Sequence, residues 1–270
     1  MTAAGRERRA WDHLRKVRRF YDRESERYEI RRYGSSDGRV AHPYHERLAI
    51  LLEMFDAGGR DVLDCGCGPG ILEPHLLDRG HRVVAMDLSE KMIERARAAV
   101  AAHPSARDVR FCVGSCERLP FPDVSFDAVV CVGVLSYWPD VLPGLREIVR
   151  VLRPRGQLVL QASNLLAPLE LESRLLRRPY HRLRGVLTGR DLRDADFPMR
   201  SYVPFRLEDR LRRVGLTPVA RRHYDFRPPL LYRVAPALAD RVARTLLRAS
   251  ASRCLGLLAA GFLVKAEKEP

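Results

Sequence analysis

A group of closely spaced glycines behind an acid stands at residues 61–70, where the chain reads DVLDCGCGPG. An apolar run ends in Asp64, and glycines follow at alternate positions, Gly66, Gly68 and Gly70. Glycine has no side chain and tolerates positive φ, so such a loop can turn sharply and let a ligand lie against its backbone. The pattern predicts a buried strand, a ligand-binding loop and then a helix.

The charge at this loop indicates the kind of ligand. Dinucleotide-binding proteins use G-x-G-x-x-G, so that a pyrophosphate rests on the helix N-terminus. Here the third glycine comes one residue early, and Asp64 would repel a pyrophosphate. An acid suits a ligand with a cationic end, and S-adenosylmethionine is such a ligand because its amine and its sulfonium are both positive. The same features disfavour a nicotinamide oxidoreductase.

A second acid follows at the expected distance. Residues 81–89 form another apolar strand that ends in Asp87. An acid about twenty residues past the glycines hydrogen-bonds the hydroxyl groups of a ribose. Two strands, one helix and two acids therefore predict one nucleoside-binding site.

At this point the sequence resembles the class I S-adenosylmethionine-dependent methyltransferases. The likeness continues in order through residues 110–123, 125–130 and 145–156, spans roughly residues 60–163, and is to the branch acting on small molecules and lipid-soluble quinones. The resemblance implies an enzyme of class EC 2.1.1.- with S-adenosylmethionine as cofactor. It also implies an α/β fold, namely a Rossmann-like, seven-stranded, mostly parallel sheet with one antiparallel strand and helices on both faces. A helical insertion is expected after strand five.

The family pattern assigns cofactor-binding roles to eight residues. They are Asp64, Gly66, Gly68, Gly70, Asp87, Leu88, Ser115 and Cys116. The first four would surround the methionyl part, Asp87 would hold the ribose, and Leu88 would lie against the adenine. Ser115 stands where the family most often has Asp, and its hydroxyl can also accept a hydrogen bond from the adenine amine. The backbone amide of Cys116 would donate to the ring.

The segment expected beside the transferred methyl group departs from the family pattern. Many relatives carry one or two histidines where this chain has Ser136 and Tyr137. Transfer from a sulfonium mainly requires alignment and exclusion of water, whereas an alcohol acceptor would also need a general base. We therefore expect an acceptor that ionises easily. Tyr137 and His181 are the catalytic candidates, with Tyr202 and His223 as further alternatives.

The composition predicts a soluble α/β protein with a basic surface. The 270 residues are 46% hydrophobic and 30% charged, which favours one domain with insertions. The formal net charge of +14 is consistent with an acidic partner, but it also follows from an arginine-rich composition. The six cysteines match no zinc site or disulfide framework, so we expect no metal and a reducing, cytoplasmic location. We also expect neither a signal peptide nor a membrane span.

Four regions are expected along the chain. They are an N-terminal helical cap (1–57), the S-adenosylmethionine-binding core (58–164), a basic helical insertion or lid (165–200) and the C-terminal part of the same α/β domain (201–270). In the insertion, leucines alternate with arginines, and no acid occurs between positions 173 and 190. This pattern is typical of an interfacial helix or of a lid for a greasy, anionic substrate, and a solvated hairpin is the alternative.

These observations predict methyl transfer to a small acceptor that is hydrophobic or anionic, with peripheral membrane contact through the basic insertion. A nucleic-acid methyltransferase is one alternative, favoured by the net charge of +14 but disfavoured because no RNA-binding module or target-base motif is present. A catalytically inactive, cofactor-binding homologue is another, consistent with Ser115 and the missing histidines. The sequence leaves the oligomeric state open.

Overall fold

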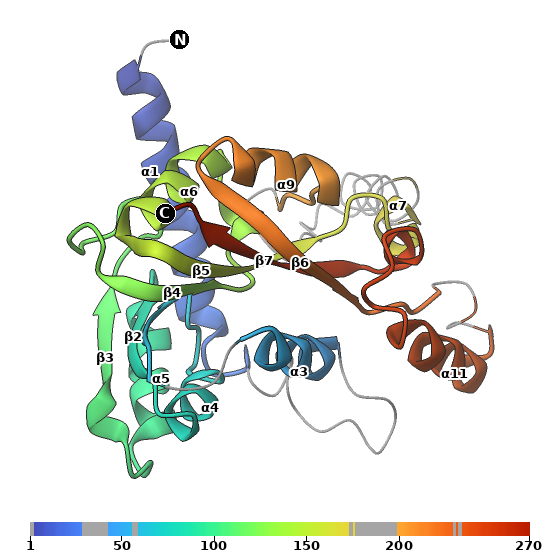
Figure 1. Cartoon of the computed structure of the whole chain (residues 1–270), viewed down its shortest axis with the longest axis horizontal. Helices are drawn as coiled ribbons and strands as arrows, with labels where there is room; N and C mark the ends of the chain where they lie inside the picture. Colours follow the sequence, from blue (N-terminus) through green and yellow to red (C-terminus); the bar gives the residue numbers. More distant parts are fainter. Residues whose placement is uncertain are drawn as a thin grey trace, which may run out of the picture.

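A seven-stranded sheet lies at the centre of the computed structural model, with helices against both of its faces (Figure 1). The structure describes residues 3–28, 43–55, 59–172, 175, 199–228, 231 and 234–270, without the side chains of 3–10 and of Leu169. The strands are β1 (Asp61–Cys65), β2 (Arg82–Asp87), β3 (Val109–Val113), β4 (Phe126–Cys131), β5 (Leu152–Ser163), β6 (Leu216–Tyr224) and β7 (Gly261–Lys268).

The strand order is β3-β2-β1-β4-β5-β7-β6. Strands β1 to β5 pair in parallel, and β7 runs antiparallel between β5 and β6. The predicted mostly parallel sheet with one antiparallel strand is therefore confirmed. Parallel pairing brings the carboxyl ends of β1, β2 and β4 to one edge, which is where open α/β sheets bind ligands.

The helices are α1 (Ala3–Glu24), α3 (Pro43–Met54), α4 (Glu73–Asp78), α5 (Glu90–Val100), α6 (Val141–Val151), α7 (Pro168–Glu172), α9 (Pro204–Arg212) and α11 (Pro236–Leu247), with 3-10 turns η1 (Ala106–Asp108), η2 (Leu135–Tyr137) and η4 (Leu255–Leu258). Successive strand residues point to opposite faces. Val62 accordingly joins the apolar cluster with α3, α4 and α5, whereas Leu63 joins the cluster with α6 and α9.

Side chains end or begin several of these elements. Ser89 caps α5 by accepting a hydrogen bond from the Met92 amide at 3.2 Å, as expected, and Asp140 caps α6 by accepting from the Leu142 amide at 3.2 Å. A capping side chain satisfies one of the amides that a helix start leaves without a partner. The cap at Ser89 fixes the start of α5 directly behind Asp87.

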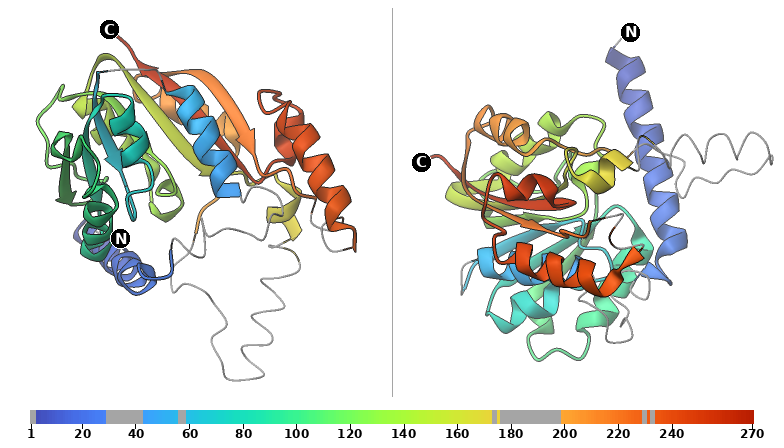
Figure 2. Two further views of the ribbon diagram at one scale, coloured as in Figure 1. Left: turned by 90° about the horizontal axis from the view of Figure 1, so that it is seen from below. Right: turned by 90° about the vertical axis from the view of Figure 1, so that its right-hand side faces the viewer.

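Two long connections join strands in the second half of the sheet (Figure 2). The first begins with α7 after β5, but most of the predicted 165–200 insertion, including His181, lies outside the described residues. The second contains α11 and η4 and connects β6 to β7. Within the part of the chain that the structure describes, no helix combines the length and the apolar character needed to cross a bilayer.

Candidate functional site

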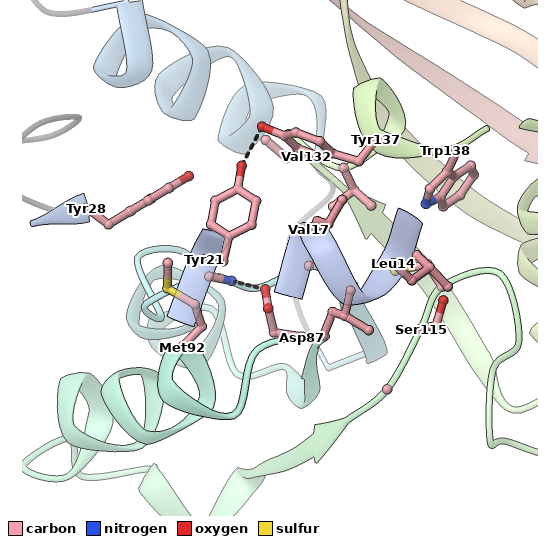
Figure 3. Close-up of a pocket in the computed structure, with 17 residues that line it drawn as sticks. Leu14, Val17, Tyr21, Tyr28, Asp87, Met92, Ser115, Val132, Tyr137 and Trp138 are labelled. Atoms are coloured by element: carbon pink, nitrogen blue, oxygen red, sulfur yellow. Dashed lines mark hydrogen bonds between the residues drawn. The ribbon is translucent and has the colours of Figure 1, made fainter. Parts of the chain in front are cut away.

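The main cavity opens at the carboxyl ends of β1, β2 and β4 (Figure 3). It encloses about 630 Å³ of empty space, counted out to the solvent at its mouth, which is within the usual size of a ligand site. Six of the eight residues predicted to bind the cofactor line it, namely Gly66, Gly68, Asp87, Leu88, Ser115 and Cys116, as does the catalytic candidate Tyr137. The sheet thus brings together residues that lie far apart in the sequence.

The three loop glycines all have positive φ, but each is needed for a different reason. A Cβ atom at Gly66 would lie 2.1 Å from the Val134 side chain, and one at Gly70 would lie 2.6 Å from the Cα atom of Ala96 in α5. A Cβ atom at Gly68 would meet nothing within 4 Å. Gly68 therefore faces the open cavity, whereas Gly70 serves the packing of the loop on α5 and is not among the residues lining a cavity.

Asp87 holds the loop and the start of α5 in place. Its Oδ2 atom accepts a hydrogen bond from the Gly68 amide at 3.0 Å, and its Oδ1 atom accepts one from the Ser89 amide at 2.8 Å. Burial raises the pKa of this carboxyl group to about 6. The carboxylate remains ionised above that pH and lines the cavity, so it can also accept hydrogen bonds from a ligand.

A second cavity of about 500 Å³ lies on the other side of the glycine loop. Gly66, Gly68, Tyr28 and Val132 line both cavities, so the two meet along the loop. Asp64 lines the second one, and its contact with the methionyl part of the cofactor stays a prediction. A ligand with two chemically different ends fits such a divided site.

Two acids and one arginine are buried around this second cavity. Asp64 is 3% exposed, Glu73 of α4 is fully buried, and Arg47 of α3 is 8% exposed. Burial raises the pKa of Asp64 to about 7, and burial beside Asp64 raises the pKa of Glu73 well above its ordinary value. The charge of Asp64 contributes to the raised pKa of Glu73, and among the described residues the carboxyl oxygen atoms of Glu73 have no well-formed hydrogen bond.

Helix α1 covers the main cavity with Leu14, Val17 and Tyr21 (Figure 3). The Tyr21 hydroxyl donates to the Tyr137 hydroxyl, and the two rings meet edge to face at a centroid distance of 5.5 Å. His13 donates from Nε2 to the carbonyl oxygen of Tyr137 at 2.6 Å. The helix is therefore tied to the segment that the family pattern places beside the transferred methyl group.

A further hydrogen bond links α1 to the cofactor loop region. The hydroxyl of Ser89 donates to Oδ1 of Asp22 at 2.6 Å while it accepts from the Met92 amide. An exposed ion pair joins Arg18 to Glu90 at 3.4 Å, and such a pair stabilises little. The covering helix is thus held mainly by hydrogen bonds at His13 in its middle and at Tyr21 and Asp22 near its C-terminal end.

The residues that the family pattern assigns to adenine lie together on one wall of the cavity. Leu88, Ser115 and Cys116 line the wall together with Gly114. The Ser115 hydroxyl accepts a hydrogen bond from the Glu117 amide at 3.3 Å, so part of its capacity stabilises its own loop. An Asp at this position would have additional acceptor sites.

Two residues considered for catalysis, Tyr202 and His223, have structural roles instead, and Ser136 lies away from the cavity. The Tyr202 hydroxyl donates to the carbonyl oxygen of Leu135 at 2.9 Å, and burial raises its pKa to about 12. His223 is fully buried, hydrogen-bonds the carbonyl oxygen of Ser250, and has a pKa lowered to about 4 by burial. Ser136 is not among the cavity-lining residues, and its carbonyl accepts from the Arg200 amide. Tyr202 and His223 as candidate bases were therefore wrong predictions.

Sequence reasoning missed Arg47, Glu73 and His13. Arg47 and Glu73 lie on amphipathic helices, where a charged residue is ordinarily solvated. No local pattern distinguishes them, and only packing of α3 and α4 on the sheet buries them beside Asp64. Among the described residues, no group of three or more His, Cys, Asp and Glu side chains could hold a metal ion.

The residues present fit S-adenosylmethionine. Buried carboxyl groups on both sides of the loop suit its cationic amine and sulfonium, and Arg47 offers a positive charge to its carboxylate. Gly68 leaves the backbone open to the ligand, and Leu88 and Cys116 provide an apolar wall for a flat ring.

Comparisons with known proteins agree with this geometry. Residues 63–160 match a family model described as a methyltransferase domain. The chain is 35% identical over 119 residues to a ubiquinone biosynthesis O-methyltransferase of Xanthomonas oryzae pv. oryzae (strain PXO99A), covering 44% of this chain and 49% of that protein. It is 39% identical over 132 residues to a malonyl-(acyl-carrier protein) O-methyltransferase of Erwinia pyrifoliae, covering 45% and 47% of the two chains.

A solved structure extends the likeness of the fold to nearly the whole chain. The (4+2)-cyclase SpnF superposes with a TM-score of 0.63 over 94% of this chain and 95% of its own, at 20% identity. The chain spans about half the length of these two curated relatives. Residues 63–160 therefore form a class I S-adenosylmethionine-dependent methyltransferase domain with S-adenosylmethionine as its cofactor, and over this part the chain resembles relatives named for small-molecule methylation.

Proposed function

We propose that this protein transfers the methyl group of S-adenosylmethionine to a small acceptor that is hydrophobic or anionic. The observation that carries the proposal is a single cavity with two kinds of wall. One wall consists of the loop glycines and Asp87, and the other consists of apolar and aromatic side chains, several of them from α1. The first wall suits the cofactor, and the second leaves an apolar space beside it.

The names of the curated relatives are consistent with such an acceptor. One relative acts in ubiquinone biosynthesis and the other on a malonyl group, which is a carboxylate. Within the described residues, no histidine lines the cavity. A phenol or a carboxylic acid loses its proton without a strong base, whereas an alcohol does not. Ionisable phenols and carboxylates are therefore the acceptors that these walls favour.

The cofactor supplies a methyl carbon bonded to a positive sulfur, and an acceptor lone pair forms the new bond to that carbon as the carbon–sulfur bond breaks and its electrons return to sulfur. The residues of this chain hold the reactants in line and exclude water. Tyr137 orients the acceptor through its hydroxyl, and Tyr21 fixes the Tyr137 ring. His181 remains a catalytic candidate outside the described residues.

Arg47 would bind the carboxylate of the cofactor in the second cavity. Its guanidinium lies over the Tyr44 ring at 4.6 Å. It is also close enough to Asp64 to offset in part the burial that raises the pKa of that carboxyl group. Replacement of Arg47 with Met should weaken S-adenosylmethionine binding about tenfold to a hundredfold, since a charge-assisted contact is lost. Methylthioadenosine lacks the amino-acid part, so its affinity should stay within about twofold in calorimetry. An equal loss for both ligands would mean that Arg47 only supports the fold.

The acceptor is tested by incubating the protein with methyl-labelled S-adenosylmethionine and cell extract. The products are then separated into organic-soluble, aqueous small-molecule, protein and nucleic-acid fractions, with Asp87→Ala as the control with weakened cofactor binding. Label in the organic or small-molecule fraction supports the proposal. Label in nucleic acid alone would overturn it in favour of the nucleic-acid methyltransferase, which the net charge of +14 favours.

A protein that binds the cofactor without transferring its methyl group is the second candidate. It is favoured by the lack of a histidine in the cavity wall, among the described residues, and by the likeness of the fold to the (4+2)-cyclase SpnF. Calorimetric binding of S-adenosylmethionine without label in any fraction, across extracts from several growth conditions, would support this candidate instead.

A further inference from the structure

The connection between β6 and β7 is much longer than the fold requires. The two strands are antiparallel neighbours, which a loop of about 2–5 residues can join. Here residues 225–260 intervene and form α11 and η4. Phe226, Ala243 and Ala259 give this segment a small apolar cluster of its own. Neither this length nor this apolar cluster is needed to join the two strands, which indicates that the segment has a function of its own.

This segment leaves the sheet at the same edge as the cavity. Ser163 at the end of β5 and Tyr224 at the end of β6 both pair with Gly261 at the start of β7. The side-chain amide of Asn164 donates to carbonyl oxygens of Gly256, Leu257 and Ala259, which fixes η4 beside the start of α7. Figure 2 shows α7, η4 and α11 gathered at one end of the molecule.

The surface of these elements combines exposed leucines with arginines. Leu238 of α11 is 49% exposed, and Leu171 of α7 and Leu257 and Leu258 of η4 are also exposed. Arg244 and Arg248 project from the same α11 segment into solvent, and no carboxylate of the described residues pairs with either. We call these six residues the leucine–arginine face. Between positions 226 and 260 the sequence has six arginines and one acid.

We propose that the leucine–arginine face docks on an anionic lipid bilayer. Arginines at a membrane surface are attracted to acidic headgroups, while exposed leucines enter the region below them. A nucleic acid would use the arginines but gain nothing from the leucines, and single strands favour exposed aromatic rings. The described residues of this face present leucine in place of aromatic rings. Charge and apolar surface together therefore fit a lipid surface best.

The test is co-sedimentation of the full chain with vesicles of phosphatidylcholine alone or mixed equally with phosphatidylglycerol. We expect binding to the mixed vesicles only, weakened by 0.5 M salt because screening shortens the reach of the charges. The double variant Arg244→Glu, Arg248→Glu should bind at least about tenfold more weakly. The double variant Leu257→Ser, Leu258→Ser keeps the net charge and should also bind more weakly.

Arg107 and Arg110 provide the matched control, because both are exposed and lie at β3, on the opposite edge of the sheet. Their double replacement with Glu changes the net charge equally and should leave vesicle binding within about twofold of wild type. Equal losses of vesicle binding in the two arginine double variants would overturn the proposal. Unchanged vesicle binding in the leucine double variant would also overturn it. If the wild-type chain forms a dimer in solution and the leucine variant does not, the proposal is overturned in favour of a second copy of the chain as the occupant of this face. Binding is measured without cofactor or acceptor, so its result is independent of methyl transfer.

Discussion

The floor and the roof of the main cavity are built differently. The floor consists of backbone and buried carboxyl groups at the ends of hydrogen-bonded strands, with Gly68 open to the ligand and Asp87 bonded to the loop. The roof consists of side chains on α1, held by hydrogen bonds from His13 and Tyr21. The floor therefore carries what the whole family shares, which is the cofactor. We propose that the roof decides which acceptor fits and how it enters.

The largest expected effect is on the packing of the floor. Gly70→Ala would place Cβ 2.6 Å from the Cα atom of Ala96, at a φ of 86°. Overpacking and left-handed strain together should lower the free energy of unfolding by about 2–5 kcal/mol in urea titrations. Gly80→Ala is the control, since Gly80 has a φ of 75° but nothing within 4 Å of its Cβ position. It should cost about 1–2 kcal/mol, and equal losses would contradict the packing argument.

The next effect is on cofactor affinity. Asp87→Ala removes the acceptor of two loop hydrogen bonds and the proposed partner of the ribose. Calorimetry should show a loss of about 1–3 kcal/mol in binding free energy. Asp209→Ala, which removes an exposed carboxylate on α9, should leave the affinity unchanged. Unchanged affinity in Asp87→Ala would remove the main support for the cofactor site.

A smaller effect concerns pH. Because Asp64 in the folded chain has a pKa of about 7, and a cationic ligand prefers its ionised form, cofactor affinity should rise about tenfold from pH 6 to pH 8. The stability of the ligand-free protein should change with pH in the opposite direction. The folded chain keeps a proton that the unfolded chain loses, so the stability contributed by this group falls between about pH 4 and pH 7.

The variant Asp64→Asn separates the effect of this carboxyl group on cofactor affinity from the effects of the other titrating groups. The amine of the ligand titrates in both proteins, and Asp87 contributes near pH 6 in both. Only the rise near pH 7 should disappear in the variant. Identical pH profiles for the two proteins would show that Asp64 does not act on the ligand.

The smallest effect is expected from the roof. Tyr21→Phe removes the hydrogen bond to Tyr137 but keeps the ring contact, so the free energy of unfolding should fall by about 0.5–1.5 kcal/mol. Cofactor affinity should stay within about twofold, with Tyr28→Phe as the control. A loss of affinity as large as that of Asp87→Ala would show that roof and floor do not act separately.

The fold and the floor could be predicted because local chemistry determines them. Glycine adopts the positive φ at Gly66 and Gly68 with the least strain, and an acid at the end of a strand has a defined place at the sheet edge. The seven-stranded sheet with one antiparallel strand was implied by the resemblance to the family, and the structure confirms it. The division into regions 1–57, 58–164, 165–200 and 201–270 stays a prediction.

The roles of other residues depended on contacts between distant segments. Arg47 and Glu73 became part of the site only because α3 and α4 pack on the sheet beside Asp64. His223 and Tyr202 looked available but are buried and bonded to backbone carbonyls. By itself the sequence determined the strands, the glycine loop and the cofactor acids, since these obey local geometry. Tertiary structure alone decided which charged and titratable side chains are buried together, because burial depends on packing between elements far apart in the chain.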